Sequence, residues 1–193
     1  MFTGIIESLG KIVEIEKEGT NIHYTLTCPF TSELKIDQSL AHNGICLTVV
    51  NIKDNQYTVT AIKETLEKTS MHSWEIEDEV NLERCMLANG RFDGHVVQGH
   101  VDTVGVCKNI EERDGSWVFS FSYESEDITV EKGSITINGT SLTVVNSKEK
   151  EFSVHIIPYT YDHTVFKNIT IGDEVNLEFD IIGKYVSKLL PQK

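Results

Sequence analysis

Two histidines in the middle of the chain, His95 and His100 of GHVVQGH, have side chains that bind metals and transfer protons. We expect the valine-rich stretch around them to form a strand, on which side chains five positions apart point to opposite faces. No pattern of cysteines or carboxylates completes a zinc site nearby. We therefore predict no metal here. Each histidine is then an ordinary strand residue with a backbone partner.

Cysteine thiols are the second group with reactive potential, and the chain has four: Cys28, Cys46, Cys85 and Cys107. They form no C-x-x-C pair, and the N-terminal sequence lacks the positive and long apolar regions of a signal peptide. The expectation is four reduced thiols in a cytoplasmic protein. No run of eighteen apolar residues occurs, so no membrane span is predicted. Cys46 differs from the others because it lies in a stretch that occurs twice.

That duplicated stretch is NGICLTVVN at 43–51 and NGTSLTVVN at 138–146, a shift of 95 residues. The same shift places DEVNLE at 78–83 on DEVNLE at 173–178. From Ser39 to Asn51, eight of thirteen positions are identical to their partners. Chance would give roughly one identity in sixteen positions at ordinary composition. We infer that one structural unit is built twice.

Matched positions of the two units carry different polar groups. Cys46 is matched by Ser141, and His100 is matched by Ile5. Further unequal pairs are His42 and Ile137, Lys63 and Pro158, Thr60 and His155, and Cys85 and Asp180. Drift after duplication explains most of these differences. The functional alternative is two similar pockets that bind similar ligands and treat them differently, and the identical residues around Cys46 favour a pocket wall there.

Short strands with closely spaced turns are predicted in both units. Polar residues separate the apolar residues from Gly4 to Ile15, and Val49 to Val59 has the pattern strand, turn, strand. Turn signals are Asn-Gly at 43–44 and 138–139 and Asp-Gly at 114–115. Short helical turns are expected at Glu64–Ser70 and Tyr159–Thr164. Each unit is therefore predicted to be a small closed barrel or sandwich, with residues 87–94 as the linker.

One amphipathic helix is predicted, at the C-terminal end. Asp180 is its expected N-cap, and the apolar pairs that follow are Ile181, Ile182, Tyr185, Val186, Leu189 and Leu190. About ten residues are too few for a stable isolated helix, so the apolar stripe must pack on something. Its counterpart at 86–95 contains two glycines and cannot be the same element. The helix is therefore a candidate oligomerisation element rather than one that packs only on its own barrel.

The charge and the remaining motifs exclude several classes of function. The net charge is −13 and no basic run occurs, which argues against binding a nucleic acid. No G-x-S-x-G nucleophile motif, P-loop or G-x-G-x-x-G occurs. Spacing alone predicts a duplicated β-barrel protein that binds a small molecule twice.

Six motifs are spread along the whole chain: MFTGII at 1–6, SLAHNGICLTV at 39–49, KET at 63–65, GHVVQGHVD at 94–102, GSITINGTSLTVV at 133–145 and IIPYTYDHT at 156–164. Together they resemble the motifs of the riboflavin synthase family (the α-subunit type). The resemblance implies an all-β homotrimer whose chains are a tandem duplication of two six-stranded Greek-key β-barrels followed by a C-terminal helix. The implied divisions are a lumazine-binding barrel at 1–88, a second at 89–180, and an oligomerisation helix and tail at 181–193.

The reaction that this resemblance implies uses two identical substrate molecules. Two molecules of 6,7-dimethyl-8-ribityllumazine exchange a four-carbon unit and give riboflavin and 5-amino-6-(D-ribitylamino)uracil. Such a dismutation needs two similar pockets that face each other and differ enough to make one molecule the donor. The active site is implied to lie between the N-terminal barrel of one subunit and the C-terminal barrel of its neighbour. The resemblance does not indicate which of the two barrels binds the donor molecule. Lumazine synthase is a candidate partner in a larger complex.

The resemblance also implies substrate-binding residues in both units. Those of the N-terminal pocket are Gly4, Ile5, Ile6, Ser39, Cys46, Leu47, Thr48, Lys63, Glu64 and Thr65. Those of the C-terminal pocket are Gly99, His100, Val101, Lys132, Ser141, Leu142, Thr143, Ile157 and Thr160. The same motifs add Thr60, Ala61, Ile62, Pro158, Tyr159, Tyr161 and Asp162. Family members often carry Asp where this chain has Asn138, which puts a charge-dependent role there in question.

Six residues are candidates for catalysis. The reaction removes a proton from the 7-methyl group of one molecule and adds a nucleophile at carbon 7 of the other. His100 is the candidate acid–base group, because an unperturbed imidazole titrates near pH 6.5. The candidate nucleophiles are Ser39, Cys46 and water. Phe2, Asn81 and Asp180 match further positions associated with activity. Holding the two rings in register contributes roughly 7–11 kcal/mol, and no metal or redox cofactor is expected.

A second class of function has the same architecture. Lumazine and flavin carrier proteins related to this family keep the double barrel but only bind the chromophore, some as light-emitting antennae. Ser39, Cys46, His100 and the terminal helix favour the enzyme over such a carrier.

Overall fold

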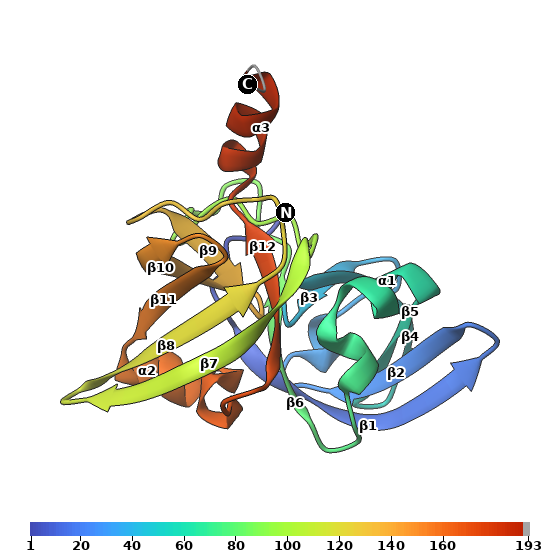
Figure 1. Cartoon of the computed structure of the whole chain (residues 1–193). Coiled ribbons are helices and arrows are strands. Elements are labelled where there is room, and N and C mark those ends of the chain that lie inside the picture. Colours follow the sequence, from blue (N-terminus) through green and yellow to red (C-terminus); the bar gives the residue numbers. More distant parts are fainter. Residues whose placement is uncertain (191–193) are drawn as a thin grey trace.

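The alternating segments of both units form strands, and the strands of each unit close into an antiparallel barrel (Figure 1). The computed structural model describes residues 1–190. The first barrel consists of β1 (Ser8–Glu18), β2 (Asn21–Thr27), β3 (Ser39–His42), β4 (Ile45–Lys53), β5 (Gln56–Ala61) and β6 (Glu79–Arg84). The second consists of β7 (Thr103–Arg113), β8 (Ser116–Tyr123), β9 (Ser134–Ile137), β10 (Thr140–Lys148), β11 (Glu151–Ile156) and β12 (Glu174–Phe179).

The strand order confirms the predicted duplication. The first barrel closes in the order β1-β2-β5-β4-β3-β6, and the second repeats it as β7-β8-β11-β10-β9-β12. In both barrels the sixth strand returns to lie beside the third, which is a Greek-key connection. The predicted helical turns are also present, as α1 (Lys63–Lys68) and α2 (Pro158–His163). Each is followed by a short 3₁₀ turn, η2 (Ser70–Ser73) or η3 (Val165–Asn168), and a third 3₁₀ turn, η1 (Thr31–Glu33), precedes β3.

The two predicted Asn-Gly turns meet where the barrels touch. Asn43 and Gly44 both have positive φ, 44° and 78°, as do Asn138 and Gly139, at 44° and 79°. This conformation is that of the tight hairpin turn which Asn-Gly favours. A Cβ added to Gly44 would lie 2.7 Å from the backbone nitrogen of Gly139, and the reverse distance is also 2.7 Å. Glycine is therefore required at both positions by the backbone conformation and by the contact.

A pair of asparagines joins the barrels beside these turns. The Asn81 amide nitrogen donates to the carbonyl of Asn138 at 2.8 Å, and its oxygen accepts from the backbone of Val165 at 2.9 Å. Asn176 makes the matching bonds to Asn43, at 2.9 Å, and to Ser70, at 2.8 Å. Asn81 is only 1% exposed. Asn81, which matches a position associated with activity in the family, is therefore buried and bonded between the barrels, and its role in activity stays a prediction.

The segment around the two central histidines differs from the prediction. Residues 95–102 form no strand; one isolated bridge joins Val97 to Phe2. The expected strand is absent because the chain is crossing here from the first barrel to the second, and Gly99 has a φ of 78°. The argument that the histidines lie on opposite faces of a strand therefore does not apply.

The C-terminal helix, α3 (Ile181–Leu189), begins where predicted, and it projects from the end of the second barrel (Figure 1). Asp180 caps it by accepting from the backbone nitrogen of Ile182 at 2.9 Å. Tyr185 is 66% exposed and Leu189 is 82% exposed, so their face is not covered within one chain. The predicted tail at 191–193 lies outside the described residues. Among residues 1–190, no helix is long and apolar enough to cross a membrane.

Each barrel is closed around an apolar core, and the first core contains a buried histidine–tyrosine pair that the second lacks. His42 and Tyr57 are fully buried in the first barrel, and their rings join through a hydrogen bond of 3.0 Å. The matched residues of the second barrel are Ile137 and Phe152, which are also buried. Burial lowers the pKa of His42 to about 3. The imidazole therefore stays neutral in the folded barrel.

We predict that His42 makes the chain sensitive to acid. Between pH 6.5 and about 3, the unfolded chain binds a proton that the folded chain does not, so the free energy of unfolding falls as the pH drops through this window. The loss reaches up to about 5 kcal/mol, at about 1.4 kcal/mol per pH unit. The double substitution His42→Ile/Tyr57→Phe, which copies the second barrel, should remove it. Urea unfolding of both chains at pH 7 and pH 4 measures the difference, and equal losses would contradict the prediction.

Candidate functional site

Two short segments, each between the barrels, form the centre of the candidate site. The first, residues 2–6, precedes β1, and the second, residues 97–101, precedes β7; we call them the first and second crossing segments. The carbonyl of Gly4 accepts from the backbone nitrogen of Ser141 in β10 at 2.8 Å. The carbonyl of Gly99 accepts from the backbone nitrogen of Cys46 in β4, also at 2.8 Å. Each crossing segment therefore lies on the barrel formed by the other unit.

This exchange corrects the predicted grouping of residues. Gly4, Ile5 and Ile6 were assigned to the pocket of Cys46, and Gly99, His100 and Val101 to the pocket of Ser141. The structure places Gly4 against Ser141 and Gly99 against Cys46. Val101 also packs on the core of the first barrel. The repeat shows which residues correspond, but it does not show on which unit a segment packs.

A cavity of about 750 Å³ opens on the second barrel beside Ser141. It is lined by six predicted residues, Lys132, Ser141, Leu142, Thr143, Ile157 and Thr160. Arg113, Glu131, Val145, Asn146 and His155 also line it and were not predicted. Its volume suits a bound small molecule. Arg113 is paired with Glu111 at 3.0 Å, so its charge is already partly balanced at the rim.

Ser141 has a histidine partner that the sequence analysis missed. His95 Nδ1 lies 2.6 Å from Ser141 Oγ, and its Nε2 lies 3.3 Å from Thr136 Oγ1. Burial lowers the pKa of His95, so the neutral ring can accept the proton of the serine hydroxyl. His95 was predicted to be an ordinary strand residue with a backbone partner, and that prediction is wrong. The approach of residues 95 and 141 depends on tertiary contacts, so no local pattern indicates it.

The matched wall of the first barrel carries Ser39 and Cys46. Ser39 on β3 pairs with Thr48 on β4, and the half-buried Cys46 lies two residues earlier on the same strand. Burial raises the pKa of the Cys46 thiol, and a hydrogen bond with the Ser39 side chain partly opposes this. A raised pKa leaves less of the nucleophilic thiolate. This wall therefore presents a serine hydroxyl and a protonated thiol, whereas the second barrel presents a serine paired with an imidazole.

His100, the candidate acid–base residue, follows Gly99 in the second crossing segment. Its side chain is exposed, and its backbone nitrogen donates to Glu178 at 2.9 Å. Because Gly99 is bonded to Cys46, His100 lies next to the wall of the first barrel.

The other predicted residues of the first barrel follow β5. Thr60 and Ala61 end that strand, and Ile62 leads into Lys63, Glu64 and Thr65 of α1. Lys63 and Glu64 are exposed. The structure therefore places them on the surface at the edge of the same barrel as Cys46.

Two predicted catalytic positions and one departure from the family pattern have structural roles. Phe2 is fully buried and packs with Ala41 and Val97. Asp180 caps α3 and is only partly buried. The side-chain oxygen of Asn138 accepts from the backbone of Asn176 at 2.8 Å, a role that an amide or a carboxylate oxygen fills equally.

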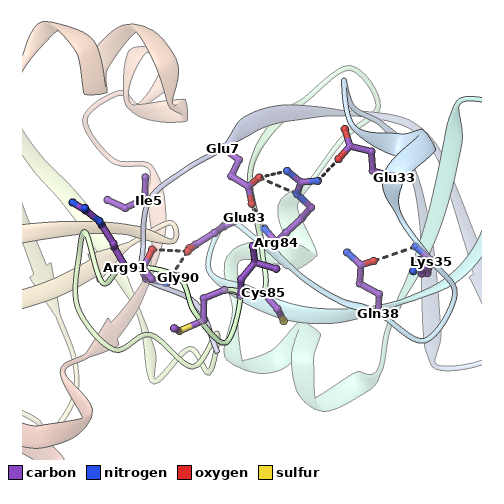
Figure 2. Close-up of a pocket in the computed structure, with 13 residues that line it drawn as sticks. Ile5, Glu7, Glu33, Lys35, Gln38, Glu83, Arg84, Cys85, Gly90 and Arg91 are labelled. Carbon is purple, nitrogen blue, oxygen red and sulfur yellow. Dashed lines mark hydrogen bonds and ion pairs between the residues drawn. The ribbon is translucent and has the colours of Figure 1, made fainter.

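A second cavity, of about 590 Å³, lies on the first barrel and is lined by Arg84 and Cys85 (Figure 2). Figure 2 shows Arg84 held between Glu7, at 2.6 Å, and Glu33, at 2.7 Å. Ile5 is the one predicted site residue that lines it. The guanidinium is already paired with two carboxylates, so this cavity offers no free positive charge from Arg84. Among residues 1–190, no group of three or more histidines, cysteines or carboxylates has an arrangement that could hold a metal ion.

Comparison with known proteins places this chain among close relatives. The family model described as the lumazine binding domain matches residues 3–85 and again 98–180. The riboflavin synthase of Actinobacillus pleuropneumoniae is 42% identical over 100% of this chain and 91% of its own length. That of Bacillus subtilis is 41% identical over 98% of this chain and 90% of its own. That of Saccharomyces cerevisiae is 35% identical over 97% of this chain and 85% of its own.

Solved structures share the fold. The structure of LumP complexed with 6,7-dimethyl-8-(1'-D-ribityl) lumazine superposes with a TM-score of 0.85 at 22% identity, covering 93% of this chain and 99% of that one. LumP complexed with riboflavin gives the same TM-score and identity over 92% of this chain and 98% of that one. At this identity the likeness establishes the double-barrel fold alone.

Proposed function

This chain belongs to the riboflavin synthase family, with two lumazine binding domains, and on that premise we propose that it catalyses the dismutation of 6,7-dimethyl-8-ribityllumazine. Two molecules exchange a four-carbon unit and give riboflavin and 5-amino-6-(D-ribitylamino)uracil. The enzyme is then a transferase. The observation that carries the proposal is the match to riboflavin synthases over nearly the whole chain, together with the doubled domain.

The unlike linings of the two barrels support a dismutation. One lumazine binds beside Ser141 and His95, in the cavity of about 750 Å³, and the other beside Ser39, Cys46 and His100. Two identical molecules bound in these surroundings meet different acids and bases. We propose that His100 transfers the proton at the wall of the first barrel, and that Ser39, Cys46 or water supplies the nucleophile. The hydroxyl of Ser141, with His95 as its base, is a further candidate.

We also propose the assembly in which this chemistry takes place. The exposed face of α3 is a surface that a second copy would cover, which supports a homotrimer with its active site between the first barrel of one subunit and the second barrel of the next. We propose that the chain is divided into a barrel at 1–88, a barrel at 89–180 and a helix and tail at 181–193. We also propose that it associates with lumazine synthase. Four free cysteines support a cytoplasmic location.

Incubation of the purified chain with 6,7-dimethyl-8-ribityllumazine tests the proposal. We expect the absorbance and fluorescence of riboflavin to appear, with one riboflavin formed for every two lumazines consumed. Riboflavin formation should be unchanged after exhaustive chelation. The alternative, a lumazine or flavin carrier, predicts tight binding without turnover. A chain that binds lumazine and leaves it unchanged would contradict the enzymatic proposal.

A further inference from the structure

A buried carboxylate on the last strand of the second barrel holds the second crossing segment. Glu178 on β12 is only 3% exposed. Its two oxygens accept from three consecutive backbone nitrogens, those of Gln98 at 2.6 Å, Gly99 at 2.9 Å and His100 at 2.9 Å. Three convergent N–H groups need a partner that only accepts hydrogen bonds. An ionised carboxylate is such a partner, whereas a protonated carboxyl group also carries a donor. The bonds fix the backbone from which the His100 side chain projects.

The opposite side of the same segment is fixed to the first barrel. The carbonyl of Gly99 accepts from Cys46 at 2.8 Å. A Cβ on Gly99 would lie 2.7 Å from the Cβ of Cys46 and 3.0 Å from its nitrogen, so the backbones are in direct contact. The segment therefore lies between a carboxylate of one barrel and the predicted substrate wall of the other.

Glu83 repeats this arrangement in the opposite direction. It is 5% exposed, on the last strand of the first barrel. It accepts from the backbone of Thr3 at 2.6 Å, from the Thr3 hydroxyl at 2.9 Å and from the backbone of Gly4 at 2.9 Å. Gly4 in turn bonds to Ser141 at the cavity of the second barrel. Both carboxylates close the identical DEVNLE stretches, which are the sequence signal that could have indicated them.

We propose that Glu178 and Glu83 are positioning residues, and that each governs the pocket on the barrel to which it does not belong. Glu178 sets the distance between His100 and the Cys46 wall, and Glu83 sets the first crossing segment against Ser141. Each pocket is therefore completed through a carboxylate on the other barrel. The consequence for turnover rests on the proposed function, whereas the crossed positioning is a structural property of the chain.

Substitution of either glutamate by glutamine tests the positioning. The glutamine NH₂ group cannot accept a hydrogen bond, so at least one backbone N–H of the crossing segment loses its acceptor. In Glu178→Gln, hydrogen exchange at the Cys46 amide should accelerate while that at the Ser141 amide stays unchanged. In Glu83→Gln the pattern should reverse. Glu174→Gln, on the same strand as Glu178 but paired with His72 at the surface, is the matched control and should alter neither amide. Equal acceleration at both amides, or none at Cys46 in Glu178→Gln, would overturn the proposal.

Turnover provides the second readout. A displacement of about 1 Å at a reacting group lowers kcat by about 10²-fold, so we expect a loss of that size in Glu178→Gln with the assembly mass unchanged. Glu178→Asp keeps the charge and should recover part of the activity, and it replaces the glutamine variant if that chain does not fold. Exchange faster at Cys46 without loss of kcat would overturn the link to catalysis. If the wild-type chain forms no riboflavin, the proposed function fails, and the crossed exchange pattern still decides the positioning.

Discussion

The double substitution Tyr185→Glu/Leu189→Glu should give folded barrels that form riboflavin about 10²-fold more slowly or worse, because the proposed site then loses the partner that holds its second substrate. Both side chains project from one face of α3 and are exposed in the single chain. In the proposed trimer that face is covered by a neighbouring copy. Two carboxylates there would have to be buried without partners, which is costly. Sedimentation equilibrium should show a monomer, and circular dichroism should show intact strands.

The control for this prediction is Lys188→Glu. It adds negative charge to the same turn of α3 without removing an apolar side chain, and Lys188 is itself exposed. We expect its mass and its rate of riboflavin formation to stay close to those of the wild type. A monomeric double variant with full activity would show that one chain contains the complete site. A double variant that stays trimeric would show that α3 is not the contact.

Local patterns predicted two units of short strands, each a small closed barrel or a sandwich, and the family resemblance selected the barrel. The two Asn-Gly turns require backbone angles that few other residue pairs adopt, and the alternation of apolar residues determines which side of each strand is buried. The shift of 95 residues then places each strand of the first barrel on a strand of the second. Asp180 was predicted correctly as a helix cap because capping depends on a residue only two positions away.

The arrangement of the site could not be predicted in the same way. The exchange of the crossing segments and the bond between His95 and Ser141 join residues far apart in the sequence, and no periodicity records them. Asn81 was named as a candidate because it matches a position associated with activity in the family. Asn81 and Asn176 are identical for a structural reason, because each one makes the same hydrogen bond across the boundary between the barrels.

The substitution His100→Ala should lower kcat by about 10²–10⁴-fold if this imidazole transfers the proton. The backbone bond to Glu178 does not involve the side chain, so the crossing segment should keep its position and the assembly its mass. His72→Ala is the control, because His72 bonds to Thr69 on the surface and touches neither pocket wall; its kcat should match the wild type. An unchanged kcat in His100→Ala would remove His100 from the mechanism.

An unchanged kcat in His100→Ala would still leave a second histidine, His95, as a candidate for proton transfer. Substitutions in the two barrels distinguish the two histidines. His95 is bonded to Ser141 Oγ at 2.6 Å on the other side of the proposed substrate pair. If His100→Ala keeps kcat and His95→Ala loses it, proton transfer belongs to the second barrel, with Ser141 as the group that loses its proton to the ring. If both variants lose activity, each pocket supplies its own acid–base group. The two unlike linings would then account directly for why one of two identical molecules gives the four-carbon unit and the other receives it.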